Sequence, residues 1–346
     1  MKEKDCSIYE NCLDTDRIDI DLSNDEKFHM LAVGCWGVYC NEGDCTIFKY
    51  KKGALARNTV TRGQGKVSEA LIAYTKEHNV SDMYLAGDNI YQEGVSDPSQ
   101  IDEFEKEKRR NLERNRNPRD PLENFNIEKQ LSQGFENCFM KADINRFFLA
   151  SGNHDIETCE VISKEINYPK WNFPSLYYQV VYKLYDYTIN IIVLDTNMFD
   201  EGEDCSGKPF TEEQIQEQER WSLSKAKNGD WNIAIGHVPY YANGHSEKKP
   251  VIKHERLEKL IHSISPQIYI CADEHNQQLI EDEKTCIVVA GSGGTALDDI
   301  LGSKPVEGTL FQNKDFGFVS YEFTKEDVLI TFLNTRLERG FQYLIK

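Results

Sequence analysis

Long apolar runs are missing from this sequence. No stretch approaches the roughly 20 consecutive apolar residues that a membrane-spanning helix needs. The first residues, Met1 to Cys6, also lack the apolar core of a signal peptide. We therefore expect no membrane span, and a protein that resides in the cytoplasm or is incorporated into a larger particle.

Positive charge is scarce relative to negative charge. The 346 residues include 40 lysines and arginines against 58 aspartates and glutamates, which gives a net charge of −18. An acidic surface argues against broad binding to nucleic acids or anionic membranes, so we expect no nucleic-acid partner. The hydrophobic content of 39% is ordinary for a globular protein, so a sizeable core can form.

A repeating cysteine framework is missing as well. Ten cysteines are dispersed along the chain without regular spacing. Because an export signal is not evident, mostly free thiols are the default expectation. Cys6 with Cys12, or Cys40 with Cys45, could still pair in an oxidising environment.

The composition changes in two places along the chain. Residues 1–25 are acidic and largely aperiodic, which indicates an N-terminal arm or a loose edge strand. Residues 26–346 contain no internal repeat and no linker, so we expect one domain there. Within it, residues 97–126 are dense in charges of both signs. Pro118 and Pro121 lie near the end of this segment. This segment is expected to be a solvated insertion; the alternative is a lid or a docking element for a protein partner.

Apolar patterns predict alternating strands and helices in the first part of the chain and β-hairpins in the last part. Together these patterns favour a mixed α/β fold in one domain. The predicted helices cover about 65–77, 127–140, 211–226 and 252–263. The predicted strands cover 28–33, 83–85, 147–150, 177–184, 187–195, 231–235, 268–271, 285–290, 318–323 and 328–333.

Polar residues that could bind a cation follow five of these strands. Asp88, for example, comes directly after Gly87, where the chain can turn sharply as the strand ends. Ligands at several strand ends suit a hydrolase in which two cations clamp one phosphoryl group. Asp88 is the natural bridging carboxylate. The candidate residues are Cys35, Asp88, Tyr91, Asn153, His237, Asp273 and His275.

Five glycine-containing or related motifs follow predicted strands in order. They are Gly34-Cys35-Trp36-Gly37, Gly87-Asp88-Asn89-Ile90-Tyr91, Gly152-Asn153-His154-Asp155, Gly236-His237-Val238-Pro239 and Ala272-Asp273-Glu274-His275. These motifs resemble those of the purple acid phosphatases, most closely the small tartrate-resistant type, in the calcineurin-like metallophosphoesterase superfamily. The resemblance covers roughly residues 27–335. It implies a four-layer αββα sandwich of two mixed β-sheets flanked by helices.

The resemblance also implies a role for each residue at a metal centre of iron with zinc, manganese or a second iron. One metal, ferric iron in the family, would be bound by Cys35, Asp88, Tyr91 and His275. The second metal would share Asp88 and be bound by Asn153, His237 and Asp273. His154 and His245 would face the substrate and act in catalysis.

Two of these positions depart from the family, because Cys35 stands where the family has Asp and Asp273 where it has His. A thiolate is softer than a carboxylate and suits Zn²⁺ or Fe²⁺ better than Fe³⁺. Cys35 could equally be a small buried hydrophobic residue, and Tyr91 a core aromatic. The sequence therefore predicts a phosphatase for small phosphoesters or phosphopeptides with an altered di-metal centre. The alternative is an inactive binding or scaffold protein that has lost its metals.

Overall fold

The computed structural model describes residues 16–37, 63–91, 127, 130–200, 202–246, 249–295, 297–298 and 305–346. The predicted insertion at 97–126 lies outside the described residues. So do the four cysteines that were candidates for pairing, which are Cys6, Cys12, Cys40 and Cys45.

Among the described residues, the larger sheet has eight strands in the order β1-β5-β6-β7-β10-β12-β11-β13. Strands β6, β7, β10 and β12 run parallel to one another. The strands are β1 (Arg17–Asp21), β5 (Tyr178–Lys183), β6 (Thr188–Val193), β7 (Trp231–Ile235), β10 (Ile268–Cys271), β11 (Gln277–Asp282), β12 (Thr285–Ala290) and β13 (Thr309–Asn313).

The smaller sheet has six strands within the described part of the chain, in the order β16-β15-β14-β2-β3-β4. Strands β2, β3 and β4 are parallel, and the last three strands form antiparallel hairpins. The strands are β2 (Phe28–Val33), β3 (Asp82–Ala86), β4 (Arg146–Ala150), β14 (Gly317–Phe323), β15 (Val328–Asn334) and β16 (Arg339–Ile345).

The two sheets pack face to face around a shared hydrophobic core. Tyr84 on β3 and Tyr182 on β5 meet across this interface, with their hydroxyl oxygens 2.9 Å apart. The ring of Phe28 on β2 also packs against Tyr182, at 4.3 Å between centroids. Apolar side chains from both sheets are thus removed from water together, which is the main stabilising term for such a sandwich.

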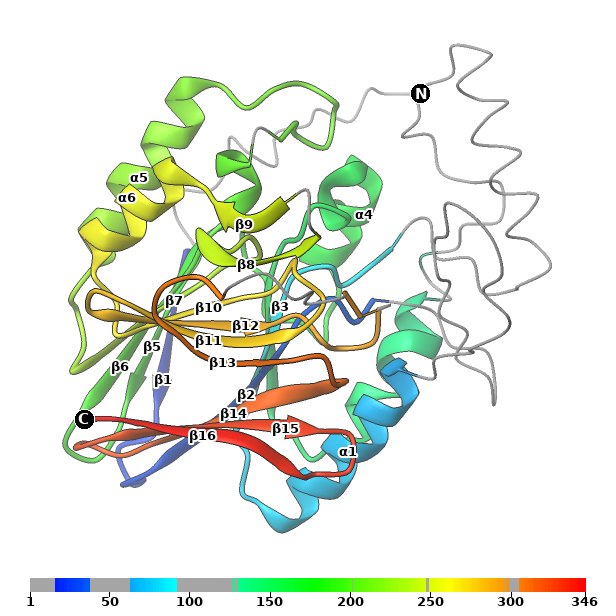
Figure 1. Ribbon diagram of the computed structural model, residues 1–346, viewed down its shortest axis with the longest axis vertical. Helices are drawn as coiled ribbons and strands as arrows, with labels where there is room; N and C mark the ends of the chain where they lie inside the picture. The colour runs from blue at the N-terminus through cyan, green and yellow to red at the C-terminus, as the bar shows by residue number, and fades with distance from the viewer. Residues whose placement is uncertain are drawn as a thin grey trace.

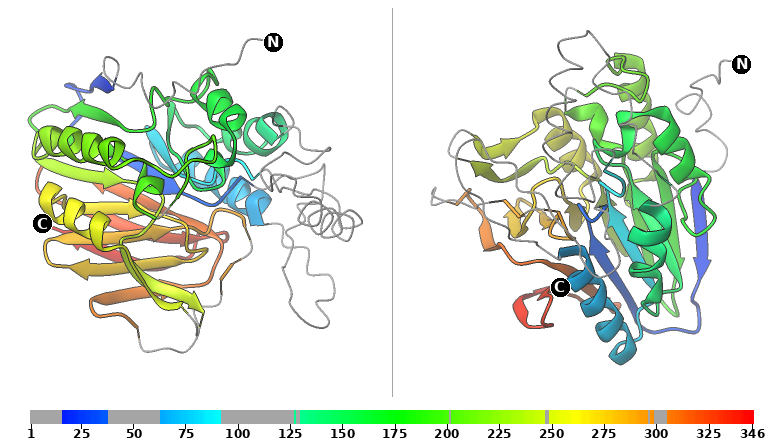
Figure 2. Two further views of the ribbon diagram at one scale, coloured as in Figure 1. Left: turned by 90° about the horizontal axis from the view of Figure 1, so that it is seen from above. Right: turned by 90° about the vertical axis from the view of Figure 1, so that its right-hand side faces the viewer.

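Helices cover the outer face of each sheet (Figure 1). On the smaller sheet, Tyr74 of α1 contacts Ser320 of β14, with 3.0 Å between their hydroxyl oxygens. On the larger sheet, Leu257 and Ile261 of α6 pack with Tyr269 of β10. In the two views of Figure 2, α1 lies on the opposite side of the sheet pair from α5 and α6. These layers confirm the predicted αββα sandwich. The helices are α1 (Gly63–Glu77), α4 (Cys159–Ile166), α5 (Glu212–Lys225) and α6 (Glu255–Ile264).

The shorter elements differ most from the predictions. The helix predicted over 252–263 begins only at Glu255, because Lys249–Lys253 forms strand β9 and pairs with β8 (Tyr241–Ser246). The predicted helix over 127–140 contains Gly134 and Ser132, which are weak helix formers. Its described part is instead a π-helix, η3 (Gln130–Glu136), followed by the 3₁₀ helix η4 (Phe139–Lys141).

Two further findings concern the N-terminal segment and the expectation of no membrane span. Strand β1 pairs in parallel with β5, so residues 17–21 form the edge strand that was one of the two expectations for the N-terminal segment. None of the described helices combines the length and the apolar character that a membrane crossing requires.

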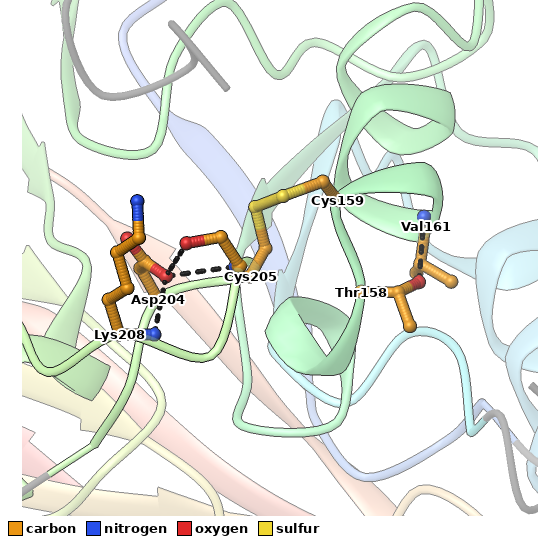
Figure 3. The surroundings of a disulfide bond; sticks show 7 residues. Thr158, Cys159, Val161, Asp204, Cys205 and Lys208 are labelled. Atoms are coloured by element: carbon orange, nitrogen blue, oxygen red, sulfur yellow. Dashed lines mark hydrogen bonds between the residues drawn. A yellow bond between two sulfur atoms is a disulfide. The ribbon is translucent and has the colours of Figure 1, made fainter. Parts of the chain in front are cut away.

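One disulfide that the sequence did not indicate is found among the described cysteines. Cys159 at the start of α4 is disulfide-bonded to Cys205, 46 residues later (Figure 3). The loop that carries Cys205 is turned by Asp204, whose carboxylate accepts hydrogen bonds from the backbone of Ser206 and Lys208. In the described part of the chain, Cys35, Cys138, Cys271 and Cys286 form no disulfide.

Candidate metal centre

The candidate residues follow the carboxyl ends of five parallel strands. Strands β2, β3 and β4 of the smaller sheet carry Cys35, Asp88 and Asn153 just beyond their ends. Strands β7 and β10 of the larger sheet carry His237 and Asp273 in the same way. Because parallel strands end at the same edge, the sandwich brings residues from both sheets to one place.

The backbone at three of these positions is unusual. Cys35, Asp88 and Asp273 have φ angles of 55°, 55° and 61°, in the left-handed region that non-glycine residues seldom adopt. Such conformations persist only where the surrounding structure holds them, and they cluster at functional sites. At each of these strand ends the chain thus turns abruptly and directs one side chain toward the others.

Close backbone packing supports these turns. A side chain on Gly87 would place its Cβ 2.4 Å from the ring of His237, and one on Gly152 would lie 2.3 Å from Oδ1 of Asp88. Gly87 also has a φ of 85°. Both positions therefore require glycine for the site to form.

Asp88 lies in the middle of the cluster. Its Oδ2 accepts a hydrogen bond of 2.7 Å from the Tyr91 hydroxyl, and its Oδ1 lies 3.3 Å from Nε2 of His237. Burial favours the neutral carboxyl, but the charges of His237 and His154 outweigh it and lower the pKa of Asp88. Asp88 is therefore an anion in contact with both sides of the site.

His237 is fully buried and faces a ring of oxygens. Its Nδ1 lies 2.8 Å from the carbonyl oxygen of Ala86, so that nitrogen donates to the backbone. Its Nε2 lies 3.2 Å from Oδ1 of Asn153, 3.3 Å from Oδ1 of Asp88 and 3.6 Å from Oδ1 of Asp273. Burial opposes a charged ring, but the two carboxylates raise the pKa of His237 above its usual range. We call these four residues, Asp88, Asn153, His237 and Asp273, the His237 half of the site.

Cys35, Tyr91 and His275 form the other half, which we call the Cys35 half. The Cys35 sulfur lies within 4.8 Å of ligand atoms of Asp88 and His237. Burial, followed by the charges of Asp88 and Asp273, raises the pKa of the Cys35 thiol well above its usual value. Burial and the charge of Asp88 do the same to the pKa of Tyr91. Both groups therefore keep their protons when no cation is bound.

His275 lies beside Asp298, and its role as a ligand stays a prediction. Its backbone nitrogen donates a 2.9 Å hydrogen bond to Oδ2 of Asp298, and its Nδ1 lies 3.8 Å from the same oxygen. Its charge contributes to the lowered pKa of Asp88, so it lies near the centre. Among the described residues, however, the group of ligand atoms within 4.8 Å of one another contains Cys35, Asp88 and His237 without it.

Of the two predicted catalytic histidines, one lies at the site and the other is not described in full. The His154 ring packs on Tyr91 with centroids 4.5 Å apart, and its Nδ1 lies 2.8 Å from Oε1 of Glu157. Its side chain is 27% exposed. His245 lies in strand β8, but its side chain is outside the described part of the chain.

The comparisons with known proteins concern the family and the fold of the chain. The sequence model of the calcineurin-like phosphoesterase family matches residues 43–277. The chain belongs to this family. The matched region includes all the candidate ligands except Cys35, which precedes it.

Curated relatives of this chain include the tartrate-resistant type that the motifs indicated. Tartrate-resistant acid phosphatase type 5 of Mus musculus is 25% identical over 227 residues, which cover 61% of this chain and 66% of the mouse protein. Glideosome-associated protein 50 of Plasmodium falciparum is 24% identical over 186 residues, which cover 49% of this chain and 45% of that protein. The chain thus spans less than two thirds of either relative.

Solved structures show the same fold at low identity. GAP50, described as the anchor in the inner membrane complex of Plasmodium, matches with a TM-score of 0.63 and 17% identity, covering 93% of this chain and 89% of its own. A purple acid phosphatase from yellow lupin seeds matches with a TM-score of 0.57 and 15% identity, covering 94% of this chain and 55% of its own. Both matches concern the fold.

The two halves of this candidate site fit a metal to different degrees. The His237 half offers three oxygens around one imidazole nitrogen, a donor set that suits Zn²⁺ or Mn²⁺. When the His237 ring is neutral and donates from Nδ1, its Nε2 carries a lone pair. This lone pair and the three oxygens repel one another unless a proton or a cation lies between them. The Cys35 half fits a cation only after Cys35 and Tyr91 lose their protons.

The structure also reveals supporting residues whose roles were not predicted. Asp155 accepts hydrogen bonds from the backbone of Gly152, Asn89 and Ile90, and so ties the Asp88 loop to the Asn153 loop. Burial and the charge of Asp88 raise its pKa to about 7. Asp155 is the last residue of the Gly152-Asn153-His154-Asp155 motif, and its place in this motif was the sequence feature that could have indicated its supporting role.

Thr196, which lies just beyond the end of the neighbouring strand β6, supports His237. Its Oγ1 accepts hydrogen bonds of 2.9 Å from the backbone nitrogens of both His237 and Val238. It follows strand β6, which ends at Val193, and so belongs to the same edge of the sheet. The sequence around it gave no separate indication of this role.

Proposed function

We propose that the protein is a phosphomonoesterase whose catalytic centre is built on the His237 half. The observation that carries this proposal is the contact of His237 Nε2 with three oxygens from Asp88, Asn153 and Asp273. Four side chains from four different strand ends converge on one point, which supports a role in binding a cation. The family resemblance supports the same assignment.

Bound cations would supply Lewis-acid stabilisation of the phosphoryl oxygens and an activated water. The protein would hold them through Asp88, which contacts both halves of the site, with zinc or manganese favoured in the His237 half. The carbonyl of Ala86 fixes the His237 ring in the tautomer that directs a lone pair at the site.

The partly exposed residues define where a phosphate would approach. Asp273 is 30% exposed and His154 is 27% exposed, whereas Asp88 and His237 are buried beneath them. Because Nδ1 of His154 is bonded to Glu157, a contact between this ring and the substrate has to use Nε2. Nε2 would donate to a phosphoryl oxygen or to the departing alkoxide.

A second candidate function is a non-catalytic anchor or scaffold. The specific observation in its favour is Cys35, a buried thiol that keeps its proton at a position where the family has a carboxylate. The fold likeness to GAP50, over 89% of that chain, is consistent with this candidate. A protein partner at residues 97–126 stays a prediction.

The Cys159–Cys205 disulfide bears on where either function would operate. Disulfides persist in oxidising environments and are rare in the cytosol. We infer that this chain folds in an oxidising compartment, or within a particle assembled there, rather than in the cytoplasm.

Hydrolysis of p-nitrophenyl phosphate tests the enzymatic proposal. The full chain should be produced with added Zn²⁺, Mn²⁺ and iron, and assayed beside Asp88→Asn. Asp143→Asn is a matched control, because Asp143 is exposed and lies at the other end of β4. We expect turnover in the parent and in the control and its loss in Asp88→Asn. Equal rates in all three, or no turnover with metal bound, would instead support the anchor.

A further inference from the structure

The loop between α1 and β3 carries a short motif that the candidate centre does not use. Its sequence is Asn79-Val80-Ser81. Asparagine, then any residue except proline, then serine or threonine is the acceptor motif for N-linked glycans in exported proteins. Asn79 is the only asparagine in the whole sequence that begins such a motif. We call these three residues the 79–81 motif.

The acceptor side chain is accessible, and its local structure does not explain its identity. Asn79 is exposed and lies two residues after Glu77, where α1 ends. Its amide has no hydrogen-bond partner among the described residues. Asparagine often follows a helix because it tolerates the left-handed backbone conformation. Asn79, however, is not among the described residues with a positive φ. Neither hydrogen bonding nor backbone geometry therefore accounts for an asparagine here.

The rest of the motif is held in place by its backbone. The backbone nitrogen of Ser81 donates a 2.9 Å hydrogen bond to the carbonyl of His29, and its carbonyl accepts one of 3.0 Å from Asn145. The Val80 side chain is buried. The Ser81 hydroxyl has no hydrogen-bond partner within the described part of the chain. The fold thus fixes the loop and leaves available the two side chains that define an acceptor motif, the amide of Asn79 and the hydroxyl of Ser81.

The motif and the candidate centre lie at opposite ends of β3. Asn79 precedes this strand, which runs from Asp82 to Ala86, and Asp88 follows it. At about 3.3 Å per residue, the strand alone separates the two by roughly 17 Å. A bulky group on Asn79 would therefore leave the approach to the centre open.

An independent observation indicates a compartment in which such glycans are attached. The Cys159–Cys205 disulfide joins α4 to the loop before α5, and neither cysteine belongs to the 79–81 motif. Disulfides form and persist in the lumen of the endoplasmic reticulum, and they are rare in the cytosol. In eukaryotic cells the same lumen is where N-linked glycans are transferred to growing chains. The disulfide and the motif thus indicate the same compartment from two separate parts of the molecule.

We propose that Asn79 carries an N-linked glycan. In the transfer, Nδ2 of Asn79 attacks the anomeric carbon of the first N-acetylglucosamine of a lipid-linked oligosaccharide diphosphate. The new C–N bond replaces the bond from that carbon to the diphosphate oxygen, the amide loses one proton, and the lipid diphosphate leaves. This modification does not depend on whether the centre is catalytic. A bulky, solubilising glycan at this end of the smaller sheet would keep that end from serving as a protein interface.

The test is to produce the full chain behind a cleavable secretion leader in eukaryotic cells and to treat it with peptide N-glycosidase. We expect the treatment to lower the apparent mass of the parent and to convert Asn79 to aspartate, which peptide mass spectrometry detects. Asn79→Gln and Ser81→Ala should each lack the glycan, whereas Ser81→Thr, which preserves the motif, should keep it. Asn228→Gln is a matched control, because Asn228 is exposed but begins no acceptor motif, and it should be modified like the parent.

The same digest shows whether Cys159 and Cys205 are joined, and so whether the chain folded in an oxidising compartment. A parent chain that contains the disulfide but has an unmodified Asn79 would overturn the proposal. A glycan that persists in Asn79→Gln would do the same. Reduced Cys159 and Cys205 in the recovered chain would also overturn it, because the observation that indicates the compartment would be lost.

Discussion

The two halves of the candidate centre have opposite chemical characters although they share Asp88. In the His237 half, a buried imidazole nitrogen faces three oxygens at 3.2–3.6 Å. In the Cys35 half, burial keeps the protons on Cys35 and Tyr91, and His275 is associated with Asp298. The difference teaches that the His237 half has one proton to release, that of the His237 ring, whereas the Cys35 half has to release the protons of both Cys35 and Tyr91.

The two departures from the family therefore have different consequences. Asp273, where the resemblance implies a nitrogen ligand, places an oxygen 3.6 Å from Nε2 of His237, so the His237 half would keep a full set of donors. Cys35 replaces a hard carboxylate with a buried thiol in a left-handed backbone conformation, with a φ of 55°. Asp tolerates that conformation better than Cys, so Cys35 carries backbone strain that an aspartate there would reduce.

The largest expected effect comes from the residue that the halves share. Asp88→Asn should abolish cation binding in both halves and lower phosphatase activity at least about 10²–10³-fold, because charge stabilisation at the phosphoryl group is lost. Metal content and p-nitrophenyl phosphate hydrolysis measure this directly. If the variant kept one bound metal, the halves would be independent and Asp88 would not bridge them.

The next effect should come from restoring the family ligands. Cys35→Asp with Asp273→His supplies a hard oxygen to one half and a neutral nitrogen to the other, so we expect activity to rise about 10-fold or more. The two single variants show which half limits the parent, and Cys35→Asp should account for most of the gain. If the double variant binds two metals but is no faster than the parent, the two replaced ligands do not limit activity, and His154 and His245 would be the next residues to test.

A smaller effect should distinguish the halves by affinity. Asn153→Ala removes one oxygen from the His237 half, and we expect the affinity for Zn²⁺ to fall about 10-fold. Cys35→Ala, which removes the sulfur from the other half, should leave the first Zn²⁺ affinity within about 2-fold. Titration against a competing chelator measures both. The opposite order of effects would mean that the thiol half binds the first metal.

The smallest effect should come from support of His237 by Thr196. Thr196→Val keeps the shape of the side chain but removes the acceptor for the backbone nitrogens of His237 and Val238. We expect the free energy of unfolding to fall by about 1–3 kcal/mol and Zn²⁺ affinity to fall a few-fold. Denaturant unfolding and the same chelator titration test this. Unchanged values for both would show that the backbone alone positions His237.

Much of the fold could be predicted because glycines and polar residues mark the strand ends. Asp88, Asn153 and His237 each follow an apolar strand, and the structure brings all three together. Strands β13 and β16 were not predicted, since they are sheet edges on which exposed and half-buried residues alternate. The β8–β9 hairpin was missed because its second strand, Lys249–Lys253, has a lysine at each end.

The supporting contacts of the site could not be predicted, since each joins distant parts of the chain. The Cys159–Cys205 disulfide spans 46 residues and has no local spacing signal. The contact between Thr196 and His237 spans 41 residues and depends on neighbouring strands in the sheet. The hydrogen bond from the backbone nitrogen of His275 to Asp298 likewise joins residues that are 23 positions apart.

The most direct test of the central claim is the metal content of the purified full chain after metal-supplemented production and dialysis. Elemental analysis should find about one or more metal ions per chain in the parent and in Asp143→Asn, and almost none in Asp88→Asn. Less than about 0.2 metal per chain in the parent, under conditions in which the protein is folded, would contradict the account. His237 would then be a buried imidazolium among carboxylates, and the fold would serve as an anchor.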